Sequence, residues 1–146
     1  MGWMCLCALM LLTQCTTGYV DLGLPSGTLW KESNEDGLHD YEFSVERFGC
    51  SIPTKEQWEE LQSECSWTWV GDGYKVQGPN GAELYLPAAG WVYCDGVDFG
   101  EGSYGDYWSS TAYDETDAWS VHFHEREVKV GYDYRCLGHS IRLVKK

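Results

Sequence analysis

The periodicity of apolar residues switches from helical to strand-like near Cys65, and this switch limits the folds open to the chain. Between residues 38 and 48, apolar side chains recur at a spacing that places them on one face of a helix. These side chains are Leu38, Tyr41, Val45 and Phe48. Gly49 follows, and glycine commonly ends a helix. After Cys65, short alternating segments are separated by turn residues, which predicts an α+β domain with a mainly antiparallel sheet.

A second helix is predicted to begin after Thr54, because the segment T-K-E-Q at 54–57 matches a capping box. In that motif the Thr54 hydroxyl accepts a hydrogen bond from the Gln57 amide, and the Gln57 side chain reaches back to the Thr54 backbone. Trp58, Leu61 and Cys65 then form an apolar stripe on the helix.

Short strands are predicted on both sides of the two helices. The Asn-Gly pair at 80–81 favours a turn between two of them, because it supplies positive φ angles. Residues 96–105 form a glycine-rich acidic segment that we expect to be a loop. The predicted strands are 19–22, 28–30, 74–76, 83–86, 88–93, 107–111, 118–124, 128–130 and 140–144.

Length and charge exclude several classes of protein. The chain has 146 residues, of which 43% are hydrophobic, and this suits one domain with a packed core. Asp and Glu number 23 against 10 Lys and Arg, a net charge of −13 that a nucleic-acid backbone would repel. No apolar run reaches the roughly 18–20 residues of a membrane-spanning helix. We therefore expect neither a nucleic-acid partner nor a membrane channel.

The first twenty residues contain no charged side chain. Such an apolar stretch is typical of a secretory signal. The segment L-T-Q-C at 12–15 resembles the lipobox of bacterial lipoproteins, in which the cysteine is lipidated and becomes the new N-terminus. We expect residues 1–18 to be a signal or lipoprotein leader with Cys15 as the lipid anchor, and residues 19–146 to form the domain. A hydrophobic N-terminal strand and a wrongly assigned start codon are the alternatives.

Four cysteines follow the expected leader: Cys50, Cys65, Cys94 and Cys136. An exported protein lies in an oxidising compartment, where disulfides are favoured. Four cysteines allow three sets of pairs. We expect Cys50 and Cys65 at opposite ends of one helix, too far apart to bond, and we favour a bond between Cys65 and Cys94. Four buried or free thiols fit the spacing equally well.

Several sequence blocks match one known family in the same order along the chain. The blocks are Y-V-D-L-G-L-P-S-G-T-L-W at 19–30, I-P-T-K-E-Q-W at 52–58, W-T-W at 67–69, G-Y-K-V at 73–76, G-P-N-G at 78–81, L-P-A-A-G at 86–90, Y-W-S-S-T at 107–111 and S-I-R-L-V at 140–144. They resemble the Fibrobacter succinogenes major paralogous domain of Bacteroidetes surface proteins, over nearly all of 19–144. That family is related to the formylglycine-generating, sulfatase-modifying fold and has a C-type-lectin-like architecture. The resemblance implies paired N- and C-terminal strands, two helices, and a loop region that displays a binding face.

Residues 107–144 also resemble the variable proteins of diversity-generating retroelements, which use this fold. Those proteins keep a fixed apolar frame and vary exposed positions near the C-terminus. The resemblance implies a variable ligand-binding face made by Tyr113, Asp114, His122, His124, Arg126, Tyr132, Asp133, Tyr134, Leu137 and His139. Exposed tyrosines are common anchors of binding surfaces, and we expect Tyr132 and Tyr134 to be exposed. For Trp91, packing in the core or sheet is favoured.

Metal and nucleotide sites are not predicted. His122 and His124 lie two apart on a predicted strand and share a face, with Cys136 and His139 as possible neighbours, but no spacing completes a zinc ligand set. The G-x-G-x-x-G match at 100–105 is followed by a strand pattern instead of the helix that phosphate binding needs. The nearby acids lack EF-hand spacing. These acids are Asp95, Asp98, Glu101 and Asp106.

The expected function is non-catalytic binding of a protein or glycan ligand on another cell or on a host surface. No cofactor is expected, and the membrane is contacted only through the lipid anchor of an exported outer-membrane or cell-surface protein. Ser109, Ser110, His122 and Asp117 lack a nucleophile-elbow motif. One alternative is an enzyme related to formylglycine generation, which uses a cysteine pair and would depend on Cys94 and Cys136. The other is a structural, fimbria-associated surface subunit.

Overall fold

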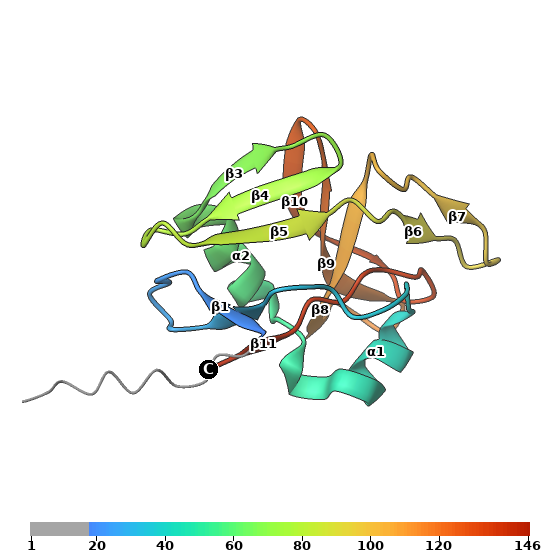
Figure 1. The fold of residues 1–146 in the computed structure, drawn as a ribbon. Helices are drawn as coiled ribbons and strands as arrows, with labels where there is room; N and C mark the ends of the chain where they lie inside the picture. Colours follow the sequence, from blue (N-terminus) through green and yellow to red (C-terminus); the bar gives the residue numbers. More distant parts are fainter. Residues whose placement is uncertain (1–17) are drawn as a thin grey trace, which may run out of the picture.

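The computed structural model describes residues 18–146, which form two α-helices, one 3₁₀ turn and eleven strands (Figure 1). The elements in chain order are β1 (Tyr19–Asp21), β2 (Leu29–Lys31), α1 (Tyr41–Phe48), η1 (Gly49–Ser51), α2 (Lys55–Glu64), β3 (Ser66–Trp69), β4 (Gly73–Gln77), β5 (Glu83–Pro87), β6 (Trp91–Val92), β7 (Asp98–Phe99), β8 (Gly105–Ala112), β9 (Asp117–His124), β10 (Glu127–Tyr134) and β11 (Val144–Lys145). The expected leader and its anchor, Cys15, lie outside the described residues, apart from residue 18. Within the described part, no helix has the length and apolar character needed to cross a membrane.

The strands in residues 18–146 form four small sheets with the orders β1-β2-β11, β10-β9-β8, β3-β4-β5 and β6-β7. Every strand pairing in these sheets is antiparallel, so the α+β prediction with a mainly antiparallel sheet is confirmed. The C-terminal strand β11 shares a sheet with the N-terminal β1, but its hydrogen-bonded partner is β2, with Val144 opposite Trp30. The expected direct pairing of the N- and C-terminal strands is therefore wrong: the first and last strands of residues 18–146 share a sheet but are separated by β2.

Both predicted helices are present, and their caps fix where they begin. Around α2 the capping box is complete, because Thr54 Oγ1 accepts from the Gln57 amide and the Thr54 amide donates to Gln57 Oε1. Helix α1 begins later than the apolar pattern indicated. Asp40 caps it by accepting from the Phe43 amide, and this leaves Leu38 outside the helix. The apolar pattern starts before the helix does, because the spacing of apolar residues does not show which residue caps the N-terminus.

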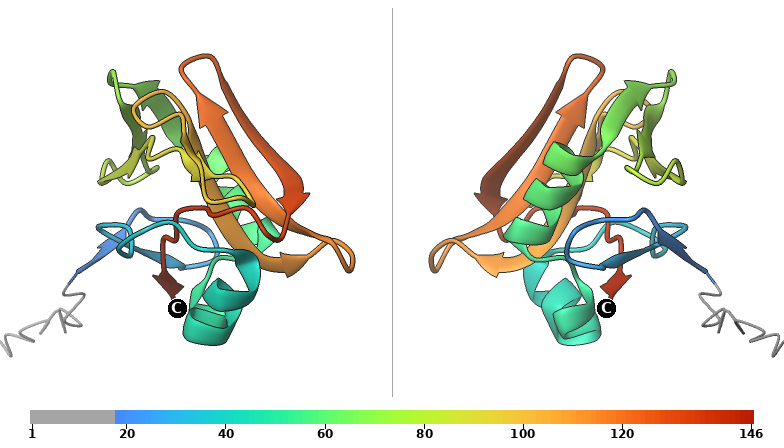
Figure 2. Two further views of the ribbon diagram at one scale, coloured as in Figure 1. Left: turned by 90° about the vertical axis from the view of Figure 1, so that its right-hand side faces the viewer. Right: turned by 90° about the vertical axis from the view of Figure 1, so that its left-hand side faces the viewer.

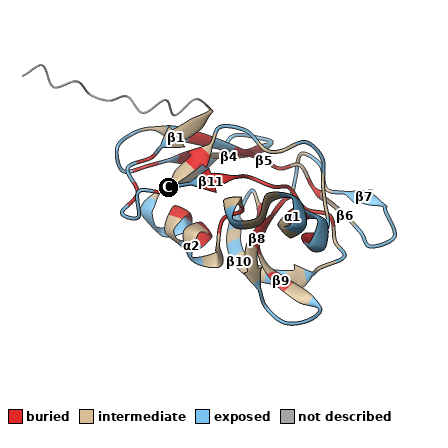
Figure 3. Ribbon diagram, turned by 90° about the horizontal axis from the view of Figure 1, so that it is seen from below, coloured by how far each residue is buried: buried red, intermediate tan, exposed pale blue. Residues whose placement is uncertain are grey.

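Helix α2 lies along the β8–β9–β10 sheet (Figure 2). Trp58 on this helix packs edge-on against Trp30 at 4.7 Å and against Tyr107 at 5.5 Å between ring centroids. The Trp58 indole also donates a hydrogen bond to the Trp108 carbonyl. Buried residues are concentrated in strands such as β4, β5 and β8, whereas the short strand β7 is exposed (Figure 3). The aromatic contacts of Trp58 join α2 to the β8–β9–β10 sheet, which we call the central sheet, within a main core that also contains many Leu and Val side chains.

The predicted strand at 88–93 is reduced to the two residues of β6. Gly90 interrupts it with a φ of +73°, and a Cβ there would lie 2.2 Å from the Phe99 carbonyl oxygen. The segment expected to be only an acidic loop supplies β7, which pairs with β6. The resulting β6–β7 hairpin projects from the body of the domain (Figure 1).

The predicted strand at 140–144 is also shorter than expected. Residues 138–140 make isolated bridges, including a parallel bridge between Ser140 and Tyr107, and only β11 is a strand.

The cysteine pairing differs from the one that the sequence favoured. Cys94 and Cys136 form a disulfide, so the Cys65–Cys94 pairing is wrong, and so is the alternative of four unpaired thiols. Cys50 lies in η1 and Cys65 caps the C-terminus of α2, so they do not mark two ends of one helix. Both are free, with Cys50 exposed and Cys65 half-buried.

Candidate functional site

Strand β9 divides its side chains between two faces of the central sheet. Trp119, Val121 and Phe123 alternate with Ser120, His122 and His124. The rings of His122 and His124 lie 6.2 Å apart, as expected for residues on one face. Val121 and Phe123 enter the main core, so the histidine face remains available for a site.

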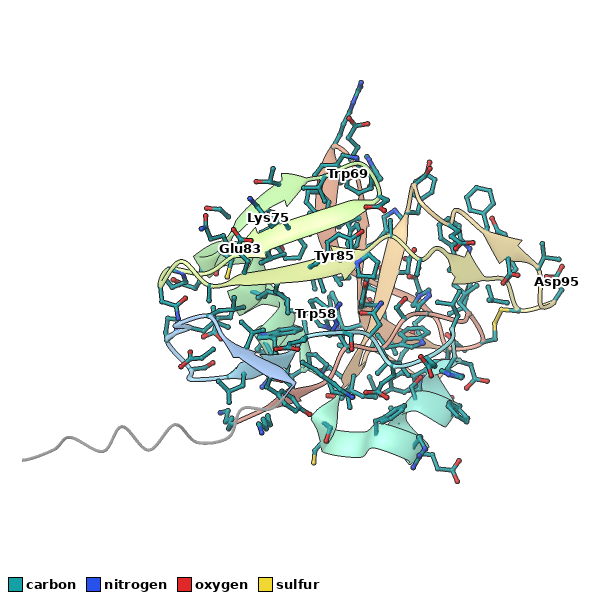
Figure 4. All side chains as sticks on the ribbon, in the orientation of Figure 1. Trp58, Trp69, Lys75, Glu83, Tyr85 and Asp95 are labelled. Carbon is teal, nitrogen blue, oxygen red and sulfur yellow. A yellow bond between two sulfur atoms is a disulfide. The ribbon has the colours of Figure 1, made fainter. Side chains whose placement is uncertain are left out.

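A pocket of about 720 Å³ opens on the histidine side, between the β6–β7 hairpin and the central sheet. It is lined by Trp91, Tyr93, Cys94, Asp95, Asp106, His122, Asp133, Tyr134, Leu137 and His139. Figure 4 shows Asp95 at the outer end of the hairpin. Within residues 18–146 this pocket brings together more of the predicted binding residues than the other pockets do. We call it the aromatic pocket.

Trp91 is the centre of the aromatic side of this pocket. Its indole lies 4.7 Å from the Phe99 ring, 5.8 Å from Tyr93 and 6.1 Å from His122, measured between centroids. Trp91 is half-buried and lines the pocket. The favoured sheet packing of Trp91 is present, because Trp91 lies opposite Phe99 in the β6–β7 pairing, but its indole also lines the cavity. Tyr93 and Phe99 of the projecting hairpin pack against Trp91 and keep its indole beside the cavity.

Asp106 and His122 form a paired acid and base in the aromatic pocket. The β8–β9 register places the two residues directly opposite each other, and Asp106 Oδ1 lies 2.9 Å from His122 Nδ1. Asp106 is only 3% exposed. Its hydrogen bond to His122 raises the pKa of the imidazole despite the opposing effect of partial burial, and the negative charge of Asp106 acts in the same direction.

Asp133 and His139 form a second acid–base pair. His139 Nε2 lies 3.1 Å from Asp133 Oδ2, which also accepts a hydrogen bond from Ser120 Oγ. Burial acts to raise the pKa of Asp133, but the hydrogen bond and charge of His139 outweigh it and hold that pKa below its usual value. His139 packs on Trp108 with centroids 4.1 Å apart and is 1% exposed. The expectation that His139 belongs to an exposed variable face is wrong, because Trp108 and Asp133 anchor its ring.

Two buried atoms in this group have no hydrogen-bond partner among the described residues: Asp106 Oδ2 and His139 Nδ1. Burying a polar atom without a partner is costly, so such atoms in a pocket mark a place where a ligand, water or ion can be bound. Asp106, Asp133 and His139 each offer one oxygen or nitrogen that could bind a metal ion, and these atoms lie within 4.8 Å of one another.

Five of the ten predicted binding residues line the aromatic pocket: His122, Asp133, Tyr134, Leu137 and His139. Tyr134 is 65% exposed, as predicted. Leu137 is half-buried and packs against the small cluster of Tyr41, Trp108 and Ala118.

The other five predicted residues lie elsewhere on the domain. Tyr113 and Tyr132 are exposed and stack on each other at 3.9 Å, next to Trp119 on the opposite face of β9. The Asp114 carboxylate accepts hydrogen bonds within its own turn, from Thr116 and Asp117. His124 and Arg126 lie at the other end of β9, around the turn into β10. The ten residues therefore do not form one continuous face.

Five pocket residues were not among the ten predicted binding residues: Trp91, Tyr93, Cys94, Asp95 and Asp106. The first four belong to the β6–β7 hairpin, which is bonded to the rest of the domain by a disulfide that the sequence did not reveal. Asp106 was grouped with the loop acids, although β8 already includes it. Asp106 lies two residues before Trp108, so extending the predicted strand by one residue would have placed both side chains on the same face.

Residues 51–144 match the model of the family described as Domain of unknown function (DUF8237). Neither the curated proteins nor the solved structures gave a match to this chain.

Proposed function

Because the chain belongs to the DUF8237 family, whose description assigns no activity, we propose its function from the aromatic pocket. The domain binds a protein or glycan ligand on another cell or host surface and performs no reaction on it. The observation that carries this proposal is one cavity that combines aromatic walls with buried, paired charges.

The walls and the floor of the pocket have different roles in this proposal. Trp91, Tyr93 and Tyr134 offer large, rigid apolar surfaces, on which the apolar face of a sugar ring or a peptide side chain can pack. His122 and Asp133 supply a few fixed polar groups, which orient the ligand and give specificity. Pockets built in this way are typical of small-ligand and peptide recognition.

The finer assignment of the fold belongs to the same proposal. We infer a C-type-lectin-like domain of the Fibrobacter succinogenes major paralogous type. It is supported by the order of the matching sequence blocks and by a sheet shared by β1, β2 and β11. Retroelement-driven variation is supported only by the resemblance of residues 107–144. A reverse transcriptase gene and a near-copy of this coding segment, differing at adenines, should then lie beside the gene. Their absence would remove that origin and leave the binding function unchanged.

We place the domain outside the cytoplasm, anchored through Cys15 in the outer membrane or at the cell surface. The Cys94–Cys136 disulfide supports this location, because structural disulfides persist in oxidising compartments. Mass spectrometry of the mature protein tests the location. A lipidated Cys15 at the new N-terminus is the expected result, and an intact Met1 on a soluble protein would contradict it.

The position of Cys94 favours one second candidate, an enzyme related to formylglycine generation, because this cysteine of the disulfide lines the aromatic pocket. Such an enzyme would lose its activity when either cysteine is changed to serine. In the non-catalytic proposal the disulfide is structural. Against a serine nucleophile, the Ser109 hydroxyl donates a hydrogen bond to the Trp119 carbonyl at 2.6 Å.

Glycan and protein arrays probed with the purified protein test the binding function. We expect Tyr134→Ala to lower the affinity for any captured ligand at least about tenfold, the effect of an aromatic anchor. Tyr113→Ala is the matched control, because Tyr113 is similarly exposed but lies outside the aromatic pocket. An unchanged affinity for Tyr134→Ala, together with a loss for Tyr113→Ala, would move the site to the other face. An absence of any captured ligand would favour the structural-subunit alternative.

A further inference from the structure

Three side chains of the aromatic pocket bring metal-ligand atoms together. Asp106, Asp133 and His139 each offer one oxygen or nitrogen, and these atoms lie within 4.8 Å of one another. The residues come from β8, from β10 and from the segment that follows β10. Only the folded sheet assembles them, and for this reason no ligand spacing is visible along the sequence.

Two of these side chains are almost fully buried and carry an atom without a partner. Asp106 is 3% exposed, and its Oδ2 has no hydrogen bond among the described residues, although Oδ1 is paired with His122. His139 is 1% exposed, and its Nδ1 is likewise without a partner in the described part of the chain. Both residues line the pocket. A buried carboxylate needs a compensating positive charge, and a cation bound there would supply it.

We propose that Asp106, Asp133 and His139 bind a divalent transition-metal ion on the floor of the aromatic pocket, and that zinc(II) is the ion best suited to them. Imidazole nitrogen with carboxylate oxygen is a common zinc donor set. Calcium instead takes six to eight oxygen ligands, which this group does not provide. His122 is a positioning residue, because its hydrogen bond to Asp106 Oδ1 orients the carboxylate in the way that outer-shell partners orient metal ligands.

Three protein ligands leave at least one zinc coordination position open. Because the residues line the pocket, that position faces the cavity and accepts an oxygen or nitrogen donor from whatever enters it. This inference goes beyond the proposed ligand binding. Metal binding is measured on the protein alone, so the two proposals can fail separately.

The experiment uses the full chain, freed of metal with a chelator and titrated with zinc(II) by calorimetry, with bound metal counted by elemental mass spectrometry. We expect one equivalent to be bound by these residues and the melting temperature to rise with zinc concentration. His139→Gln and Asp133→Asn should each weaken zinc binding by about 100-fold or more. Asp133→Asn keeps the test informative if the more buried His139→Gln fails to fold, because the Asp133 side chain is 35% exposed. His124→Gln is the matched control, since it removes an imidazole that lies on β9 and does not line the pocket.

Cobalt(II) substitution separates this site from the free cysteines, which can also bind zinc. We expect visible d–d bands without a sulfur-to-cobalt charge-transfer band. A charge-transfer band from sulfur, an absence of zinc binding in the stripped protein, or equal affinities for Asp133→Asn and wild type would each overturn the proposal. So would stabilisation by calcium(II) but not by zinc(II) at matched concentration.

Discussion

Cys94, in the turn of the β6–β7 hairpin, is bonded to Cys136, two residues beyond the end of β10. The bond therefore connects the projecting hairpin to the segment that carries Tyr134, Leu137 and His139. The amides of Val92 and Gly138 also donate hydrogen bonds to each other's carbonyls, and this adds a second connection between the same two segments. The aromatic pocket lies between these two segments, so its width depends on this contact.

The disulfide should contribute substantially to stability. It closes a loop with a sequence separation of 42, and the chain-entropy relation then gives about 4 kcal/mol at 25 °C. We expect Cys94→Ala/Cys136→Ala, or reduction of the wild type, to lower the free energy of unfolding by about 2–4 kcal/mol in urea titrations. Cys50→Ser is the control and should not change it, because Cys50 is free and exposed. Identical midpoints with and without reductant would show that the bond adds nothing to the folded state.

The two free thiols of residues 18–146, Cys50 and Cys65, should differ in reactivity. Partial burial raises the pKa of the Cys65 thiol from its ordinary 9.0 to about 11, and the charges of Glu64 and Glu60 add to the effect. The reactive thiolate of Cys65 is then about a hundredfold scarcer at pH 8 than for an unperturbed thiol. We expect iodoacetamide at pH 8 to alkylate the exposed Cys50 at least about tenfold faster, as followed by peptide mass spectrometry. Equal rates would mean that Cys65 is more accessible than the structure describes.

Local features of the fold were predictable because local sequence determines them. The capping box at Thr54 and Gln57 depends on two residues three positions apart, and both of its hydrogen bonds are present. The alternation of residues 118–124 likewise predicted which face of β9 carries His122 and His124. Neither prediction requires knowledge of a distant part of the chain.

The composition of the site could not be predicted because it depends on contacts between distant residues. Asp106 meets His122 through the β8–β9 register, and His139 meets Trp108 through a chain reversal after β10. Neither contact leaves a periodic signal in the sequence. The same limit explains the disulfide, because spacing alone could not choose Cys136 as the partner of Cys94.

Arg142 is a buried charged residue whose guanidinium needs several hydrogen-bond acceptors within the core. It is 1% exposed, and its guanidinium donates hydrogen bonds to Asn34 Oδ1 at 2.8 Å and to the Tyr85 carbonyl at 2.6 Å. It also donates to the Lys31 carbonyl, so one side chain joins three segments. We expect Arg142→Ala to lower the free energy of unfolding by about 3–5 kcal/mol, because buried acceptors lose their donors and a cavity forms. Arg47→Ala changes an exposed arginine and should stay within about 0.5 kcal/mol in the same urea titration. Similar losses for the two variants would contradict a special role for Arg142.

Gly105 lets β8 begin directly beneath the ring of Phe123, its register partner on β9. A Cβ at this position would lie 2.1 Å from Phe123 Cζ, and that ring is fully buried in the core. Gly105→Ala should therefore destabilise the domain by about 1–3 kcal/mol, measured by urea unfolding, because either the ring or strand β8 must move. Gly131→Ala on β10 is the matched control. Its Cβ would meet only Lys129 Cε at 3.9 Å, so we expect a neutral or slightly stabilising effect.

The cause of the Gly105→Ala effect can be tested with a second substitution. If the clash with the ring is responsible, Phe123→Leu should cost less in the Gly105→Ala background than in the wild type, with a coupling of about 0.5–3 kcal/mol in a double-mutant cycle. Additive effects would show that the two residues do not compete for the same space. Because Asp106 follows Gly105 on β8, a shift of the strand should also displace the Asp106–His122 pair. Zinc affinity should then fall in Gly105→Ala and recover in the double variant.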